Sequence, residues 1–488
     1  MRTSIVVHVT GVLVRLFAAT FLAPAAVAAF YGEWAEIGGF LLAAAGSFAL
    51  GVVMSRAGGA GAQAAGDYLR RIDGLAIVAF TWLLIAHLAA VPFAWAGLGA
   101  IDALFEAMSG LTTTGATVLT DFGRFGRSVF FWRALTHWLG GMGVIALFIA
   151  VLPRLAVGGR ELFFAEAAGP TDEKLTPQLR HTALALWRLY AAITAVEVVA
   201  LVVAGMPVFD AVCTAMATLA AGGFSPHPRS IEGYDSAAVD VIVTAFMFIA
   251  GANFALQYRT VRGSRRTLVQ DEELRAYAGV VVVATLAVTV FLIRSGMPLL
   301  EAVRHGAFQV VSILTTTGFA SVDFQLWNDQ AKMVLLLLMF IGGCAGSAAG
   351  GPKVVRHILM ARCTIRELTR TLHPRAVLPV KLGGRVVPEP ILRDVQVFML
   401  FYLVTFAVGA TIVVALGADL LTGVTASIAC LGNIGPGFNA VGPMASFAEL
   451  HPVSRIVLTL EMWIGRLEVL TVLVFFRIEP WRTARWHD

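Results

Sequence analysis

Residues 312–319 of this 488-residue chain read Ser-Ile-Leu-Thr-Thr-Thr-Gly-Phe, and the stretch has three partners elsewhere in the sequence. One reads Ser-Gly-Leu-Thr-Thr-Thr-Gly-Ala-Thr at 109–117, another Thr-Leu-Ala-Ala-Gly-Gly-Phe-Ser at 218–225, and the last Cys-Leu-Gly-Asn-Ile-Gly-Pro-Gly at 430–437. We name them loops one to four in chain order. Their glycines at 115, 223, 318 and 435 align, about 100 residues apart. This recurrence indicates an internal fourfold repeat.

Each loop overlaps the C-terminal end of an apolar stretch that is too short to cross a membrane. The four stretches are 101–114, 208–221, 299–317 and 419–434. A spanning helix needs about 20 apolar residues, so these shorter stretches indicate re-entrant segments. Ten longer stretches qualify as spans: 5–31, 36–54, 74–98, 128–152, 182–205, 237–258, 276–294, 331–352, 394–417 and 453–476. Irregular backbone at membrane depth survives only when protein buries it or it lines a wet cavity, so four such loops predict a pore.

The composition agrees with a membrane protein. The chain is 58% hydrophobic and only 14% charged, whereas soluble domains are about 25% charged. The mean hydropathy is +0.80. These values argue against a soluble enzyme, a disordered chain and a fibrous protein. The four cysteines are scattered without a Cys-x-x-Cys pair, so we expect neither a disulfide framework nor a zinc site.

Basic residues orient the predicted spans. If the N-terminus is cytoplasmic, the inner segments 55–73, 152–181, 259–275, 353–393 and 477–488 hold 24 Lys and Arg. The outer segments hold six. This split satisfies the positive-inside rule and puts all four loops on the outer side. It also explains the net charge of +5 without any bound nucleic acid.

Four loops around one axis can replace the water of a dehydrated cation with backbone carbonyls. Glycine allows the turn that aims a carbonyl inward, and the C-terminal end of each short helix adds partial negative charge. The loop cores contain no Asp, Glu, Lys or Arg, which favours a carbonyl filter. The alternative is that glycine and threonine serve only close helix packing. We place the filter at Thr113, Thr114, Gly115, Ala221, Gly222, Gly223, Thr316, Thr317, Gly318, Asn433, Ile434 and Gly435.

The chain resembles the Trk/Ktr/HKT superfamily of potassium transporters, most closely its bacterial TrkH branch, over essentially its whole length. The resemblance rests on TTTGAT at 112–117, GGFS at 222–225, TTTGF at 315–319 and NIGPGF at 433–438. It implies K⁺ as the transported ion and no organic cofactor. Family members with serine at the first filter position favour sodium, and this chain has Gly115 there. Loop two departs from the family pattern, because Ala220 and Ala221 lack hydroxyls, so the degree of K⁺ over Na⁺ preference stays open.

The expected fold is an all-α polytopic membrane protein with an N-terminal helix pair and four parallel span–pore helix–filter loop–span repeats around one central pore. The divisions are 1–73 for the helix pair, and 74–181, 182–275, 276–393 and 394–488 for the repeats. The family resemblance implies that all four repeats surround one pore within a single chain.

A glycine-rich stretch interrupts the predicted span 331–352. Five glycines and a proline between 342 and 352 are incompatible with a straight helix. The resemblance implies a flexible intramembrane gate beneath the filter, while close helix packing is the alternative. The candidate residues are Gly342, Gly343, Gly346, Ser347, Gly350, Gly351 and Lys353. In its simplest role, Lys353 snorkels to the inner surface.

Arg466 lies deep in the last predicted span, where a charge is costly and marks a candidate functional site. Its helical neighbours at three and four residues include no acid, so any partner comes from another helix. The resemblance implies a charge that projects into the pore below the filter and opposes resident K⁺. A buried pair with Glu468 or Glu197 is the structural alternative. We treat the histidines, His137 among them, as structural, since they lack metal-ligand spacing.

The resemblance further implies a homodimer in the bacterial inner membrane, with both termini cytoplasmic and a TrkA-like nucleotide-binding ring as regulator. Segments 152–181, 259–275 and 353–393 are candidate docking surfaces for that ring, or ordinary positive-inside loops. A symporter coupled to H⁺ or Na⁺ is the second hypothesis, although the parallel repeats and scarce acids do not favour it. The chain has no HExxH or GxSxG motif, so we do not expect an enzyme.

Overall fold

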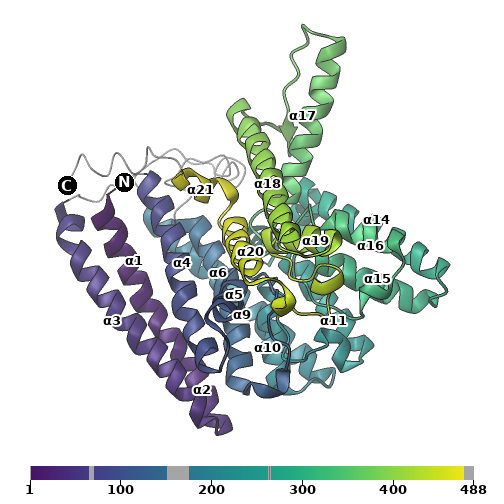
Figure 1. The fold of residues 1–488 in the computed structure, drawn as a ribbon. Helices are drawn as coiled ribbons and strands as arrows, with labels where there is room; N and C mark the ends of the chain where they lie inside the picture. The colour runs from purple at the N-terminus through teal and green to yellow at the C-terminus, as the bar shows by residue number, and fades with distance from the viewer. Residues whose placement is uncertain (1, 65–70, 151–174, 262, 264, 477–488) are drawn as a thin grey trace.

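The computed structural model describes residues 2–64, 71–150, 175–261, 263 and 265–476. The chain begins with α1 (Thr3–Phe17), the 3-10 turn η1 (Ala18–Phe21) and α2 (Leu22–Tyr31), which continue one another. Gly32 turns the chain into α3 (Trp34–Ala64), which packs along α1. This hairpin lies at one side of the molecule, as the purple helices of Figure 1 show. It corresponds to the predicted N-terminal helix pair.

Four groups of helices follow, and each contains one short helix between longer ones. The first is α4 (Arg71–Trp95), α5 (Ala100–Leu111) and α6 (Arg127–Ala150); the second is α9 (Leu175–Val203), α10 (Val208–Leu219), α11 (Ala237–Ala250), α12 (Phe254–Val261) and α13 (Arg265–Gln270). The third is α14 (Glu272–Arg294), α15 (Leu299–Leu314), α16 (Asp329–Leu338) and α17 (Val354–Leu372); the fourth is α18 (Glu389–Ala415), α19 (Leu420–Leu431), α20 (Pro452–Arg466) and α21 (Val469–Leu473). The predicted re-entrant stretches are thus the short helices α5, α10, α15 and α19.

The remaining elements are small. The 3-10 turns are η2 (Phe122–Arg124), η4 (Ser230–Tyr234), η5 (Phe324–Leu326), η6 (Asn439–Val441), η7 (Phe447–Glu449) and η8 (Val474–Phe476). Strand β1 (Lys381–Leu382) pairs antiparallel with β2 (Arg385–Val386), with Lys381 opposite Val386. This hairpin follows α17, which projects from the top of the molecule in Figure 1. The projection belongs to the predicted docking segment 353–393, whereas most of segment 152–181 and residues 477–488 lie outside the described residues.

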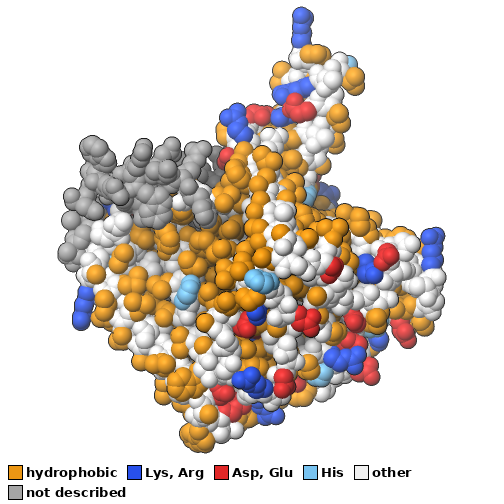
Figure 2. Space-filling view, viewed as in Figure 1, with side chains coloured by type: hydrophobic (Ala, Val, Ile, Leu, Met, Phe, Trp, Pro, Cys, Tyr) orange, Lys and Arg blue, Asp and Glu red, His pale blue; other side chains and the backbone are white. Residues whose placement is uncertain are grey.

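Six helices of the described chain are long and apolar enough to cross a membrane, and a bent pair makes a seventh candidate. They are Thr3–Tyr31, Trp34–Gly59, Ile72–Trp95, Leu184–Val203, Glu272–Arg294 and Glu389–Ala415, with Ala237–Ala250 and Phe254–Val261 as the pair. Side chains of the middle belt in Figure 2 are mostly apolar, while charged ones gather at the lower edge and on the α17 projection. This distribution is typical of a multi-pass membrane protein.

Two predicted continuous spans are broken. The predicted span 237–258 is not one straight helix, because α11 and α12 meet at 101° around Gly251, although the bent pair still qualifies as one candidate span. The Asn253 carboxamide oxygen accepts from the amides of Ala255 and Leu256, 2.8 and 3.1 Å away, and so caps α12. The predicted span 453–476 is not one continuous helix either, because α20 ends at Arg466 and Glu468 has a φ of 64°. Asn253, a residue type favoured at the start of a helix, was a local signal for the first break.

The short helices are arranged in a cycle. Each packs against the span before it and the helix after it within its own group. In addition α5 contacts α20, α10 contacts α6, and α15 contacts α11. Between the third and fourth groups, Gly350 lies against Gly432 at the end of α19. The four groups therefore follow one another around a common centre, where the short helices end.

Candidate functional site

All four short helices end in the same way. The residues Thr113, Ala221, Thr316 and Asn433 have φ values of 53° to 58°. At the first helix end, the Thr113 and Thr114 amides donate to the carbonyls of Gly110 and Ser109, at 3.1 and 2.9 Å. The corresponding pair of hydrogen bonds is present after α10, α15 and α19. This is the Schellman motif, which closes a helix with a left-handed residue, and it turns all four loops in the same direction.

The aligned glycines of the loops form a closed ring. Their φ values are positive, at 83°, 76°, 79° and 102° for Gly115, Gly223, Gly318 and Gly435. A Cβ on Gly115 would lie 2.1 Å from the Gly222 oxygen, and one on Gly223 would lie 2.0 Å from the Thr317 oxygen. A Cβ on Gly318 would lie 2.0 Å from the Ile434 oxygen, and one on Gly435 would lie 2.7 Å from the Thr114 oxygen. Each loop thus lies against the next, and loop four lies against loop one.

The carbonyls of this ring lack backbone partners. No amide of the described backbone donates to the oxygens of Thr114, Gly222, Thr317 or Ile434, although all four residues are buried. Buried carbonyls need a hydrogen bond or another positive partner. A dehydrated monovalent cation supplies such a partner for several oxygens at once. The predicted filter positions in the four loops are therefore brought together, with the chemistry of a cation site.

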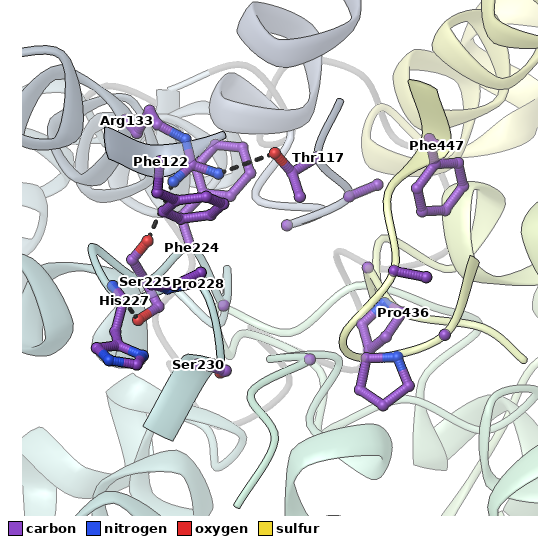
Figure 3. Close-up of a pocket in the computed structure, with 18 residues that line it drawn as sticks. Thr117, Phe122, Arg133, Phe224, Ser225, His227, Pro228, Ser230, Pro436 and Phe447 are labelled. Atoms are coloured by element: carbon purple, nitrogen blue, oxygen red, sulfur yellow. Dashed lines mark hydrogen bonds between the residues drawn. The ribbon is translucent and has the colours of Figure 1, made fainter. Parts of the chain in front are cut away.

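A cavity of about 60 Å³ lies directly on this ring. Gly115, Gly223, Gly318 and Gly435 all line it, together with Arg133 and aromatic residues of the outer segments. Figure 3 shows Arg133 and Phe224 on one side and Pro436 and Phe447 on the other. Among the lining residues that the structure describes, none is acidic, and Arg133 is the one arginine or lysine.

The predicted break in span 331–352 is confirmed. Helix α16 ends at Leu338, and residues 339–353, which we call the intramembrane loop, are not helical. Its glycines 342, 346 and 351 have φ values of 86°, 72° and 70°. The loop is bound to the break after α11, because the Cys344 and Ala348 amides donate to the carbonyls of Gly251 and Ala250, at 2.9 and 3.2 Å. Two irregular segments thus satisfy each other's backbone groups.

The far end of the intramembrane loop lies against loops three and four. The Gly350 amide donates to the Thr316 hydroxyl at 2.6 Å. A Cβ on Gly350 would lie 2.4 Å from the carbonyl oxygen of Gly432. Ser347 stabilises the bend internally, donating from its hydroxyl to the Cys344 carbonyl at 2.6 Å. The loop therefore lies next to the ends of α15 and α19.

Arg466 binds a backbone carbonyl of the intramembrane loop and not a carboxylate. Its guanidinium donates to the Ala348 carbonyl at 2.9 Å and to the Gly140 carbonyl of α6 at 3.4 Å. The structural alternative of a pair with Glu468 or Glu197 is wrong, because Glu468 binds Arg356 at 2.7 Å and neither carboxylate oxygen of Glu197 has a hydrogen-bond partner among the described residues. Lys353 does not snorkel, since its ammonium donates back to the Ala349 carbonyl. Two cationic side chains thus bond to carbonyls of the same loop.

Glu273 anchors the intramembrane loop, and it was not predicted from the sequence. One carboxylate oxygen of Glu273 accepts from the amides of Ala345 and Val355, at 2.7 and 3.1 Å. Glu273 follows Asp271 and Glu272 at the start of α14, and nothing in this acidic run distinguishes it. The Arg133–Glu106 pair behind loop one was missed too, because the partners are 27 residues apart on different helices.

The fold and the site define a class: a multi-pass helical membrane protein whose four re-entrant loops surround one axis. Comparisons with known proteins agree. The family pattern TrkH, described as cation transport protein, matches residues 48–486. The chain belongs to this TrkH family of cation transport proteins.

Individual relatives match over their whole length. The Trk system potassium uptake proteins TrkH of Salmonella typhimurium and of Escherichia coli K12 are each 37% identical over 99% of this chain and all of theirs. The protein TrkG of Escherichia coli K12 is 35% identical over the same share. The crystal structure of the potassium transporter TrkH from Vibrio parahaemolyticus is similar with a TM-score of 0.90, at 34% identity over 99% of this chain and 100% of that one.

Proposed function

We propose that this chain carries K⁺ into a bacterial cell through a pore whose selectivity filter is the ring of loops one to four. The observation that carries the proposal is the closed ring of glycines and carbonyls, in which each loop lies against the next. Relatives named for potassium uptake support K⁺ as the cargo. The membrane potential supplies about 2.3 kcal/mol per charge per 100 mV, which is sufficient to draw K⁺ inward.

The intramembrane loop is the gate in this proposal. It lies between the ring and the inner side, bound by Arg466, Glu273 and Thr316. Together with the hydrogen bonds from Cys344 and Ala348 to the break after α11, these contacts tie the loop to several separate elements, so a relative shift of those elements loosens it. Cationic groups at the loop oppose an approaching K⁺ while the loop is in place.

Regulation then comes from the cytosolic side. A TrkA-like nucleotide-binding ring docks on the basic inner segments, and α17 with its hairpin, which projects from the rest of the molecule, is a candidate surface for it (Figure 1). Two copies of the chain form a dimer in the inner membrane, with both termini cytoplasmic. Relatives that carry the words Trk system in their names support a multi-component assembly.

Rb⁺ uptake into proteoliposomes that hold only this chain tests the proposal. An inside-negative potential is imposed in Na⁺-free buffer and proton entry is followed with a pH-sensitive dye, because a symporter must bring in its coupled ion with Rb⁺ whereas a pore does not. We expect Rb⁺ uptake that external K⁺ blocks at a concentration about tenfold or more below that of Na⁺, as a carbonyl filter for K⁺ requires.

The variant Arg466→Gln is measured in parallel, because it loosens the intramembrane loop. If wild type is closed and the variant conducts, the pore is present and gated. If folded protein of both kinds conducts no Rb⁺, or if K⁺ and Na⁺ block equally, the proposal is wrong.

A further inference from the structure

Loop two lacks the hydroxyl bond that braces its counterparts. In loop one the hydroxyls of Thr112 and Thr114 lie 2.8 Å apart, and in loop three those of Thr315 and Thr317 do so at the same distance. Loop four is braced by Asn433, whose amide nitrogen donates to the Thr114 hydroxyl and to the Met462 carbonyl, both at 3.0 Å. In loop two the positions equivalent to the threonine pairs are Ala220 and Gly222, which have no side-chain hydroxyl to offer.

His137 of α6 fills the space beside this bare loop. A Cβ on Gly222 would lie 2.5 Å from the imidazole. The Nε2 atom accepts from the Phe224 amide at 3.2 Å, and Nδ1 lies 2.8 Å from the Gly110 carbonyl oxygen. Because an amide only donates and a carbonyl only accepts, the proton is on Nδ1 and the lone pair on Nε2. The neutral ring therefore bridges the end of α5 and loop two.

Arg133, one helical turn earlier on α6, binds the outer end of the same loop. Its Nη1 donates to the Ser225 carbonyl and its Nη2 to the Thr117 hydroxyl, both at 3.1 Å (Figure 3). Its Nε donates to Glu106 of α5 at 2.7 Å, in an ion pair that is 2% and 0% exposed. The guanidinium thus joins the end of loop one to the end of loop two.

Phe224 is the residue that both side chains hold. Its ring centroid is 3.9 Å from the Arg133 guanidinium carbon and 4.1 Å from the imidazole centroid. Cation–π and ring contacts of this kind stabilise a buried aromatic side chain. Phe224 directly follows Gly223, whose Cα faces the ring of carbonyls, so any movement of the aromatic ring is transmitted to the loop backbone.

We propose that Arg133 and His137 are positioning residues that fix loop two in the place of the missing threonine hydroxyls, and that the ion preference of the pore depends on them. The inference rests on the proposed filter function. It extends it, because neither residue offers an atom to the ion: they act through Phe224 and the Gly222–Gly223 backbone. The hydroxyl brace that is absent at Ala220 and Gly222 is in this way replaced from a neighbouring helix.

The test measures block of Rb⁺ uptake by K⁺ and by Na⁺ in proteoliposomes for four variants. His137→Leu removes both imidazole hydrogen bonds, and His137→Gln keeps one donor and one acceptor on a shorter group. Arg133→Lys keeps the charge beside Glu106 and removes the planar fork. Asp102→Asn is the control, since it weakens another ion pair between groups, the one with Arg455 of α20.

We expect the K⁺ preference over Na⁺ to fall about fivefold or more in His137→Leu and Arg133→Lys, while Rb⁺ uptake persists, because the carbonyl ring is displaced and not removed. His137→Gln should lie between these variants and wild type. Asp102→Asn should keep the wild-type preference even though its melting temperature in detergent falls. This separation distinguishes positioning from a general loss of stability.

Each outcome decides one of the two proposals. A wild-type protein without K⁺ preference would overturn the filter function itself. A selective wild type with an unchanged preference in both His137→Leu and Arg133→Lys would overturn the positioning role alone. If His137→Leu does not fold, Arg133→Lys and His137→Gln carry the test, and an unchanged preference in these two would equally overturn the positioning role.

Discussion

Gly318→Ala should abolish the K⁺ preference of uptake. The new Cβ would lie 2.0 Å from the Ile434 oxygen and 2.8 Å from the Pro436 ring, and backbone cannot yield as a flexible side chain can. The φ of +79° adds strain, on the order of 1–2 kcal/mol for a residue other than glycine. We expect the ratio of K⁺ to Na⁺ block to fall about tenfold or more, since one displaced carbonyl changes the coordination of every ion that passes.

Gly296→Ala is the matched control for this variant. Gly296 lies in the turn before α15 of the same group, with a φ of +94° and nothing within 4 Å of an added Cβ. It imposes the same kind of backbone strain without a contact to the ring. Its uptake should keep the wild-type preference, so an equal loss in both variants would show that strain and not the carbonyl ring is responsible.

Arg466→Gln should raise uptake by the isolated chain. The arginine ties the intramembrane loop, through Ala348, to α6, through Gly140. A hydrogen bond from a charged group contributes about 1.5–3 kcal/mol, so its loss shifts the closed population toward open by about tenfold or more. The same change removes a positive charge near the ion path, which acts in the same direction. The measurement is the initial rate of Rb⁺ uptake per reconstituted protein.

Arg294→Gln provides the comparison, because Arg294 is likewise the last residue of a helix, α14, and is exposed. Its uptake should equal that of wild type. An unchanged or lower rate in folded Arg466→Gln would contradict a gate held by this arginine. A higher rate that has also lost the K⁺ preference would indicate that Arg466 supports the ring itself.

The sequence by itself determined the class of fold and the positions of the short helices, the four loop turns and the break before Lys353. Length of apolar run distinguished the short helices α5, α10 and α19 from long spans such as α4 and α14, because crossing a bilayer and re-entering it demand different numbers of residues. The aligned glycines located the four loop turns in the sequence. A positive φ beside the carbonyl of a neighbouring loop admits no other residue without strain. The break before Lys353 was equally readable from its glycines and proline.

Tertiary structure decided which groups satisfy these irregular segments. The partner of Arg466 is the Ala348 carbonyl, 118 residues away, and a carbonyl leaves no trace in sequence because every residue has one. The bend at Gly251 exists because the intramembrane loop supplies donors to its freed oxygens. Spacing alone predicted a structural role for His137. Packing places it between α5 and loop two, where it accepts a hydrogen bond from an amide 87 residues away. Hydropathy and glycine are local signals, whereas the direction of a hydrogen bond between distant segments is set only when the helices pack.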